Sequence, residues 1–230
     1  MGGYASVTLA HASMVIPLGD SGVDPAQAVA ALPNAVTAYL ALTRVAHLQP
    51  GESVLVHGAA GGLAAPFPAV ARSLGASRIV GTVSSPSRIK DTVPVGYDAV
   101  FTSDRFVDAL TGQSIDVVVD AVGGEVRTAS LDVLAPLGRI LLLGHAAATP
   151  DTPVTRDQLW LTSAGLLGFS VGPYLQANPA SAQPAAEQVL SLLASGQLAL
   201  RIEELPLAKA AEAHQRLEAH QVPGRLLLTV

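Results

Sequence analysis

Residues 53–64, SVLVHGAAGGLA, decide the fold of this chain. The run from Val54 to Val56 is apolar, uncharged and rich in valine, as in a strand that is buried on both faces of a parallel sheet. Three glycines then crowd a turn, and helix-forming residues follow from Ala64 to Leu74. A strand, a glycine turn and a helix in this order predict a phosphate-binding corner, where backbone N–H groups approach a pyrophosphate closely.

The spacing within this turn points to a dinucleotide. Gly58-x-x-Gly61-x-x-Ala64 is a variant of the dinucleotide fingerprint in which alanine takes the last place. Its position between a strand and a helix is the context that supports such a site. We therefore predict that Gly58, Gly61, Gly62 and Leu63 bind the cofactor. The alternative is a tight turn that binds nothing.

Two prolines count against tight binding at this corner. Pro66 and Pro68 lie near the start of the expected helix. Proline is tolerated in the first turn, where its missing N–H would be unpaired anyway. Pro68 lies deeper, so we expect it to distort the first turn or to delay the helix.

Composition narrows the class of protein. Half of the 230 residues are hydrophobic and 13% are charged, which indicates a globular chain with a sizeable core. The net charge of −5 argues against a nucleic-acid surface. The chain has no cysteine and its six histidines include no H-x-x-x-H pair, so we predict no metal site. We find no signal-peptide pattern and no run of 18 apolar residues, so we expect a cytoplasmic protein that does not enter a membrane.

The segment before the glycine turn predicts helices. Residues 2–18 look extended, but nothing upstream supplies the partners that a strand needs. Asp24 is the expected N-cap of a helix that begins at Pro25 and that Pro33 ends. A second helix is expected from residue 35 to residue 46.

Three stretches carry a resemblance to a known family. They are residues 31–39 (ALPNAVTAY), 48–62 (LQPGESVLVHGAAGG) and 224–230 (GRLLLTV). The chain resembles the medium-chain dehydrogenase/reductase superfamily, and within it the zinc-independent NADPH:quinone oxidoreductases and related enoyl reductases. The likeness covers essentially the whole chain. It implies an α/β fold, with a doubly wound parallel Rossmann sheet.

The resemblance also implies a domain division. Family members carry roughly another hundred residues at the N-terminus, which form most of a GroES-like catalytic domain. We expect the Rossmann domain at residues 29–197, and remnants of the catalytic domain at residues 1–28 and 198–230. The chain is thus expected to be truncated relative to the family.

The loop after the second strand (residues 78–83) predicts the cofactor. An acidic residue there selects NAD, whereas small and basic residues accommodate the 2′-phosphate of NADP. Residues 82–90 (TVSSPSRIK) contain no carboxylate. Ser84 and Ser85 can donate hydroxyls and Arg88 can offer a charge-assisted contact, so NADPH is the expected cofactor. The alternative is a solvated helix start with a surface arginine.

By resemblance, four further residues surround the nicotinamide. The strand at residues 139–143 ends at Gly144, and its end faces the ring; Phe169 resembles a contact of the carboxamide. Thr37 and Tyr39 resemble positions on the nicotinamide side, although Tyr39 is as well explained by packing.

Two titratable residues lie near this expected site. His145 is a candidate proton donor, but a loop histidine without a role is the interpretation that the sequence favours. Asp120, at the end of another strand, is expected to cap the following turn rather than to act as an acid or base.

The sixth expected strand, residues 165–172, lies at the edge of the sheet. An apolar edge strand left bare would invite aggregation. By resemblance, two copies pair through this strand, so we expect a homodimer.

The resulting functional hypothesis is hydride transfer from NADPH to a small-molecule quinone, enone or enoyl substrate, without a metal. The alternative is a truncated, non-reductase homologue. It would act as a nucleotide-binding module or as a cofactor-free accessory or cyclase-type protein in a biosynthetic pathway, because half a cleft holds substrate poorly.

Overall fold

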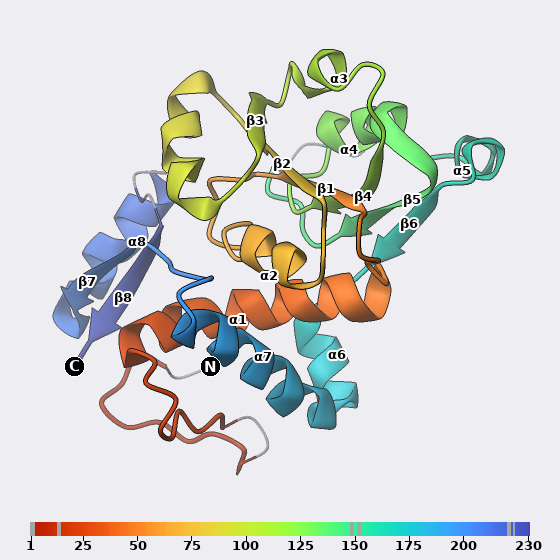
Figure 1. Cartoon of the computed structure of the whole chain (residues 1–230). Helices are drawn as coiled ribbons and strands as arrows, with labels where there is room; N and C mark the ends of the chain where they lie inside the picture. Colours follow the sequence, from red (N-terminus) through yellow and green to blue (C-terminus); the bar gives the residue numbers. More distant parts are fainter. Residues whose placement is uncertain (1–2, 13–14, 148–149, 151–152, 220–221, 223) are drawn as a thin grey trace.

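A parallel sheet forms the centre of the protein (Figure 1). The computed structural model describes residues 3–12, 15–147, 150, 153–219, 222 and 224–230. Its strands are β1 (Ser53–His57), β2 (Arg78–Val83), β3 (Ala99–Thr102), β4 (Ile115–Asp120), β5 (Leu134–Leu142) and β6 (Gly165–Gly168). They lie in the order β3-β2-β1-β4-β5-β6, which is the doubly wound dinucleotide-binding order. The predicted α/β fold class is confirmed.

Both faces of this sheet are buried. Along β1, Val54 and Val56 belong to one hydrophobic cluster, and Leu55 belongs to the cluster on the opposite face. This alternation follows from the two-residue period of a strand. It explains why β1 has no polar side and why its sequence is a continuous apolar run.

Helices cover the two faces. On one lie α1 (Pro25–Leu40) with its π-helical continuation η2 (Ala41–Val45), α2 (Phe67–Ser73), α6 (Val171–Ala177) and α7 (Ala182–Ala194); on the other lie α3 (Phe106–Ala109), α4 (Glu125–Ala129) and the 3₁₀ helix η4 (Ser130–Val133). The remaining helical segments are η3 (Pro86–Val95), α5 (Arg156–Thr162), η5 (Pro179–Ser181), η6 (Leu207–Lys209) and α8 (Ala210–Glu218).

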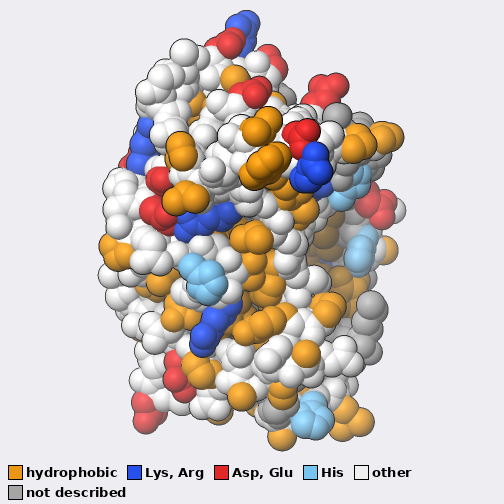
Figure 2. All heavy atoms as spheres, turned by 90° about the vertical axis from the view of Figure 1, so that its right-hand side faces the viewer, with side chains coloured by type: hydrophobic (Ala, Val, Ile, Leu, Met, Phe, Trp, Pro, Cys, Tyr) orange, Lys and Arg blue, Asp and Glu red, His pale blue; other side chains and the backbone are white. Residues whose placement is uncertain are grey.

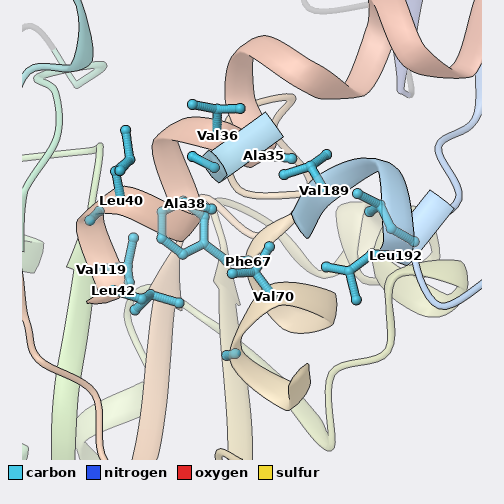
Figure 3. Packing of buried hydrophobic residues seen from close by; sticks show 14 of the residues in the cluster. Ala35, Val36, Ala38, Leu40, Leu42, Phe67, Val70, Val119, Val189 and Leu192 are labelled. Atoms are coloured by element: carbon cyan, nitrogen blue, oxygen red, sulfur yellow. The ribbon is translucent and has the colours of Figure 1, made fainter. Parts of the chain in front are cut away.

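The larger core lies between α1, α2 and α7. Figure 3 shows Ala35 and Ala38 of α1 beside Phe67 of α2, with Val189 of α7 nearby. Both alanines and Phe67 are completely buried. The small side chains let the helices approach closely, and Phe67 fills the space that remains.

The prediction that Pro33 ends a helix is wrong. The helix that Asp24 caps at the N–H of Gln27 continues through Pro33 to Leu40. Pro33 lies on the exposed side, where the loss of one N–H is tolerated, while the buried alanines hold the opposite side against the core. By length and composition, residues 25–45 could cross a membrane, but 56% of that window is buried within the protein, as in a core helix.

A small second sheet carries the C-terminal part of the chain. It pairs β7 (Ile202–Pro206) with β8 (Arg225–Thr229) in parallel, and α8 connects the two strands. It lies beside η3 and the start of α1 (Figure 1). The described residues 3–12 and 15–24 form no strand. The division at residues 28/29 and 197/198 stays a prediction, and α1 crosses the first boundary without a break.

Candidate functional site

The carboxyl ends of neighbouring parallel strands meet at one edge of the central sheet. Backbone hydrogen bonds join the loops there: the Leu143 N–H donates to the Asp120 carbonyl (2.8 Å) and the Phe169 N–H donates to the Leu142 carbonyl (3.1 Å). At the end of β1, a Cβ placed on Gly58 would lie 3.3 Å from Val122, which follows β4. The structure therefore brings the glycine turn, Gly144, His145 and Phe169 to the same edge, where ligands of open α/β sheets bind.

Two glycines are required by the geometry of the turn. Gly58 has a φ of +70°, a conformation that residues with a Cβ rarely adopt. The N–H of Gly61 donates to the carbonyl of Gly58 at 2.7 Å, and a Cβ on Gly61 would lie only 3.0 Å from that oxygen. The N–H of Gly61 is therefore already hydrogen-bonded within the turn and is not available to a phosphate.

The next peptide is oriented by a neighbouring helix. The carbonyl of Gly62 accepts a hydrogen bond of 2.8 Å from the Asn34 amide. Because the N–H of a trans peptide points away from its carbonyl, the Leu63 N–H is directed away from Asn34. The N–H groups of Gly62 and Leu63 make no hydrogen bond within the described residues, so they are the donors that this turn can offer to an anion.

The following helix starts late, as the two prolines predict. Residues 58–66 form turns, and α2 begins only at Phe67 and has seven residues. The helix end is thus separated from the glycine turn. Anion binding at this corner must depend on the N–H groups of the turn and on nearby cations.

Such a cation lies directly over the turn. A Cβ placed on Gly62 would lie 2.8 Å from Nη1 of Arg225, the first residue of β8. The Arg225 side chain is half-buried, and this burial lowers its pKa. Its guanidinium makes no ion pair or hydrogen bond with any described residue. A half-buried positive charge without a counter-charge attracts an anion.

A narrow cavity of about 70 Å³ separates Arg225 from the loop after β2. The glycine turn, Lys90, Asp91 and the segment around Leu200 complete its walls. It has room for a phosphate-sized group but not for a dinucleotide. A dinucleotide therefore requires the Arg225 side chain to leave its place over Gly62.

A carboxylate that the sequence prediction did not weigh, Asp91, directly follows the loop predicted to select the cofactor. Nε of Arg88 lies 3.0 Å from Asp91 Oδ2, although this buried Nε makes no hydrogen bond of acceptable geometry. Ser84 is exposed, and Ser85 is half-buried with its hydroxyl 3.0 Å from that of Ser87. Arg88 thus shares its charge with Asp91, and its role towards a 2′-phosphate stays a prediction.

At the opposite end of the site, a buried ion pair fixes the strand ends. Asp120 accepts hydrogen bonds from the N–H groups of Val122 (2.8 Å) and Gly123 (2.9 Å), so it caps the turn as predicted. Its other oxygen lies 2.6 Å from Nε of Arg127. Nη2 of Arg127 donates to the carbonyl of Gly144 at 3.0 Å. Arg127 therefore holds the loop of Gly144 against the end of β4.

For the other candidates near the expected nicotinamide, the structure gives the surroundings, and their roles stay predictions. His145 is exposed, and Phe169 is half-buried, edge-on to Tyr174 with 5.5 Å between ring centroids. The Thr37 hydroxyl forms a hydrogen bond within its own helix, where it donates to the Pro33 carbonyl at 2.8 Å. Tyr39 packs against the larger core, and its hydroxyl makes no hydrogen bond with a described residue.

Below the glycine turn, His57 is a structural residue. Its Nδ1 and Nε2 lie 2.7 Å from the hydroxyls of Thr82 and Ser130. Ser130 donates its proton to the Val126 carbonyl, so its oxygen accepts from Nε2–H, and Thr82 donates to Nδ1. Both nitrogens are satisfied in the neutral ring. Burial lowers the pKa of His57 to about 4, which keeps this ring neutral.

A family model described as zinc-binding dehydrogenase matches residues 95–228, more than half of the chain. The chain belongs to the zinc-binding dehydrogenase family. It is 29% identical over 240 residues to a quinone oxidoreductase of Pseudomonas aeruginosa, covering 99% of this chain and 71% of that protein. It is 26% identical over 243 residues to a 2-haloacrylate reductase of Burkholderia, with the same coverage of 99% and 71%.

A solved structure of a similar protein agrees with the fold. The quinone oxidoreductase of Escherichia coli, complexed with NADPH, superposes with a TM-score of 0.79 at 26% identity, covering 94% of this chain and 68% of that one. The resemblance to quinone oxidoreductases of the medium-chain superfamily is confirmed.

Although the name of the zinc-binding dehydrogenase family mentions zinc, the described side chains of this chain do not form a zinc site. The chain has no cysteine. Among the residues that the structure describes, no group of three His, Asp or Glu side chains could hold a metal ion. The side chains do not fit a zinc site, and we derive no step through a metal.

The sequence prediction missed Arg225, Arg127, Asn34 and Asp91 at this edge. Arg225 is the one charged residue of the strand RLLLT, where three leucines follow it, and it comes directly after a glycine. That pattern is a usable signal, because a single charged residue at the start of an apolar strand suggests a specific role for the charge. Asp91 also had a signal, because it lies three residues after Arg88. Arg127 and Asn34 carry none, since only the fold brings them to this edge of the sheet.

Proposed function

We propose that this chain binds NADPH at the glycine turn and transfers its hydride to a quinone or to an alkene conjugated with a carbonyl. The observation that carries the proposal is Arg225, a half-buried cation that lies over Gly62 and makes no ion pair with any residue that the structure describes. Relatives named quinone oxidoreductase and 2-haloacrylate reductase, and a neighbouring structure complexed with NADPH, support the same reaction class.

The chemistry would be divided between cofactor and protein. Bound NADPH supplies the hydride. Once its side chain has turned aside from Gly62, Arg225 would hold the pyrophosphate together with the N–H groups of Gly62 and Leu63. Ser85 and Arg88 would hold the 2′-phosphate. At the other end, Arg127 fixes the Gly144 carbonyl and so sets one wall of the nicotinamide site. Phe169 would form a second wall, and His145 would deliver a proton to the reduced substrate.

A cofactor-free role is the second candidate, and one observation favours it. The cavity at the glycine turn is only about 70 Å³, with Arg225 placed where a pyrophosphate would lie. In that case the guanidinium would serve the fold by covering the turn, and the chain would act as an accessory or cyclase-type protein.

Calorimetric titration of NADPH and NADH distinguishes the NADPH-dependent role from the cofactor-free role. We expect NADPH to bind, and Arg225→Met to weaken it about tenfold or more, because a hydrogen bond to a charged group contributes about 1.5–3 kcal/mol. Arg78→Met is the matched control, since Arg78 is paired with Gln113 and lies at the opposite end of β2. Absence of binding of either nucleotide to the wild-type chain would overturn the proposal and favour the cofactor-free role.

We also propose that two copies pair through β6. This strand is hydrogen-bonded only to β5, so its outer edge is open in the described structure. Figure 2 shows hydrophobic side chains gathered on the face of the molecule that carries β6 and α5. Three large apolar side chains are exposed there: Trp160 (70%), Leu161 (75%) and Leu137 (81%). Leu137 lies beside α5, because its N–H donates to the carbonyl of Ser163, the residue after that helix. A second copy would cover both the edge and this apolar rim.

Sedimentation velocity tests the pairing. We expect the wild-type chain to be a dimer and Leu161→Lys to shift it to a monomer, because a buried lysine without a partner is unfavourable. Leu217→Lys on α8 is the control, since Leu217 is also exposed but lies away from β6. A monomeric wild-type chain would contradict the proposal. The small-molecule substrate, the absence of nucleic-acid and membrane partners, and the cytoplasmic location stay predictions.

A further inference from the structure

Helix α1 contains two side-chain amides, Gln27 and Asn34, and each is hydrogen-bonded to the backbone of a distant segment. They lie two helical turns apart in the sequence, so both project from the same side of α1. The rise of the helix separates them by about 10 Å along its axis. One helix therefore holds two other parts of the chain at a fixed spacing.

The two segments that α1 holds are walls of the narrow cavity at the glycine turn. Gly62 and Leu200 both line that cavity. The Asn34 amide donates to the Gly62 carbonyl at 2.8 Å. The Gln27 amide donates to the Leu200 carbonyl at 2.9 Å and accepts from the Leu200 N–H at 3.0 Å. The width of the cavity between these walls thus depends on α1.

The wall that contains Leu200 also carries Arg225. The N–H of Arg225 donates to the carbonyl of Arg201, the residue after Leu200, at 2.9 Å. Gly224 lies so close to this carbonyl that a Cβ there would collide with it. The backbone of Arg225 is therefore fixed to the wall that α1 holds, and only its side chain is left to move.

We propose that Gln27 and Asn34 are positioning residues for the anion site, and that together they set the distance between the Arg225 backbone and the glycine turn. Through Gln27, α1 keeps that backbone in place while the side chain turns aside, so the guanidinium stays within reach of a phosphate at Gly62. Through Asn34, it keeps the Leu63 N–H directed away from α1. The inference rests on the proposed function, in which the anion is the pyrophosphate of NADPH.

Two variants remove these contacts while keeping the size of the side chain. Gln27→Met and Asn34→Leu lose the hydrogen-bonding atoms, and both residues are half-buried on a helix that methionine and leucine favour. Ser77→Ala is the matched control. The Ser77 hydroxyl also donates to a glycine carbonyl, that of Gly51 at 2.6 Å, but both residues lie at the amino end of the sheet, away from the cavity.

Titration with inorganic phosphate, followed by the proton–nitrogen NMR signals of Gly62 and Leu63, gives the readout without nucleotide. We expect both amide signals of the wild type to shift as phosphate is added. Gln27→Met and Asn34→Leu should each raise the dissociation constant for phosphate about two- to tenfold, the range that a neutral hydrogen bond contributes. Ser77→Ala should leave it unchanged.

The Arg225→Met background separates positioning from a merely structural role. Gln27 acts through Arg225, so Gln27→Met should weaken phosphate binding no further in that background. Asn34 acts on the turn itself, so Asn34→Leu should weaken binding there as well. The inference would be overturned by a Gln27→Met variant that loses the same factor in both backgrounds, or by variants that bind phosphate like the wild type.

Failure of this inference can be told apart from failure of the proposed function. A wild-type chain whose Gly62 and Leu63 signals do not respond to phosphate would overturn the inference. A chain that responds to phosphate as expected but binds neither NADPH nor NADH would keep the anion site and its positioning residues, and would lose the reductase role. Urea unfolding shows which variants are folded, and if one is not, the other decides.

Discussion

Two arginines lie at the same edge of the central sheet and have opposite surroundings. Arg127 is buried, and Asp120 and the Gly144 carbonyl satisfy its guanidinium. Arg225 is half-buried over Gly62 and has no counter-charge among the described residues. A charge that the fold neutralises serves the fold, whereas a partly desolvated charge left without a partner is available to a ligand. The contrast separates the part of the site that holds the strands from the part that can bind a phosphate.

The largest expected effect comes from breaking the Arg127 side of this contrast. Arg127→Met leaves the completely buried Asp120 without its cation. We expect the free energy of unfolding in urea to fall by about 3–5 kcal/mol. Arg225→Met, measured in the same way, should change it by no more than about 0.5 kcal/mol.

The double variant Asp120→Asn/Arg127→Met controls for the loss of packing. It should recover part of the stability that Arg127→Met loses, because no uncompensated charge remains buried. If Arg225→Met were as destabilising as Arg127→Met, both arginines would be structural, and the distinction between them would fail.

His57 sharpens the comparison, because it is a buried titratable group that is fully satisfied while neutral. Its folded-state pKa of about 4 lies below the ordinary value of 6.5. The folded state therefore favours the neutral ring, and this contribution is complete above pH 6.5 and is lost as the pH falls towards 4. The difference of about 2.5 pH units corresponds to about 3 kcal/mol.

Urea unfolding at pH 7.5 and pH 4.5 measures this loss, with His57→Gln beside the wild type. The variant should be less stable at pH 7.5 and should lose less stability on acidification. The pKa of Glu52 is lowered in the folded state, first by its hydrogen bond from Arg139, so acidification also removes stability that Glu52 contributes. Only the difference between the two proteins therefore reports on His57. Parallel pH curves would show that His57 does not titrate on unfolding.

The smallest expected effect concerns a third arginine, between the two extremes. Arg88 lies 3.0 Å from Asp91, and 29% and 17% of their side chains are exposed. Asp91→Asn should free Arg88 and tighten NADPH relative to NADH about two- to fivefold, since a partly exposed ion pair contributes at most about 1 kcal/mol. Calorimetric titration of both nucleotides measures the ratio. An unchanged ratio would mean that Arg88 does not face the 2′-phosphate.

The strands were predictable where the sequence alone carries the signal. The bounds of β2 match the predicted strand at residues 78–83, and β1 contains the predicted apolar run from Val54 to Val56, because both signals lie within the segment itself. The late start of α2 follows from two prolines, which act locally. These features need no information from distant parts of the chain.

The failures have a common cause in tertiary contacts. Pro33 does not end α1, because the buried side of that helix is held by packing. At the candidate site, the glycine turn was visible in the sequence, but Arg225 lies more than 160 residues further along.

One side chain joins the beginning of the fold to its end. The Gln27 amide donates to the carbonyl of Leu200 (2.9 Å) and accepts from its N–H (3.0 Å), as a neighbouring strand would. The same helix packs against α2 and along α7, and α7 begins more than 140 residues beyond the end of α1. During synthesis, the part of α1 that contacts α7 must therefore stay uncovered until α7 has been added, long after α2 is in place.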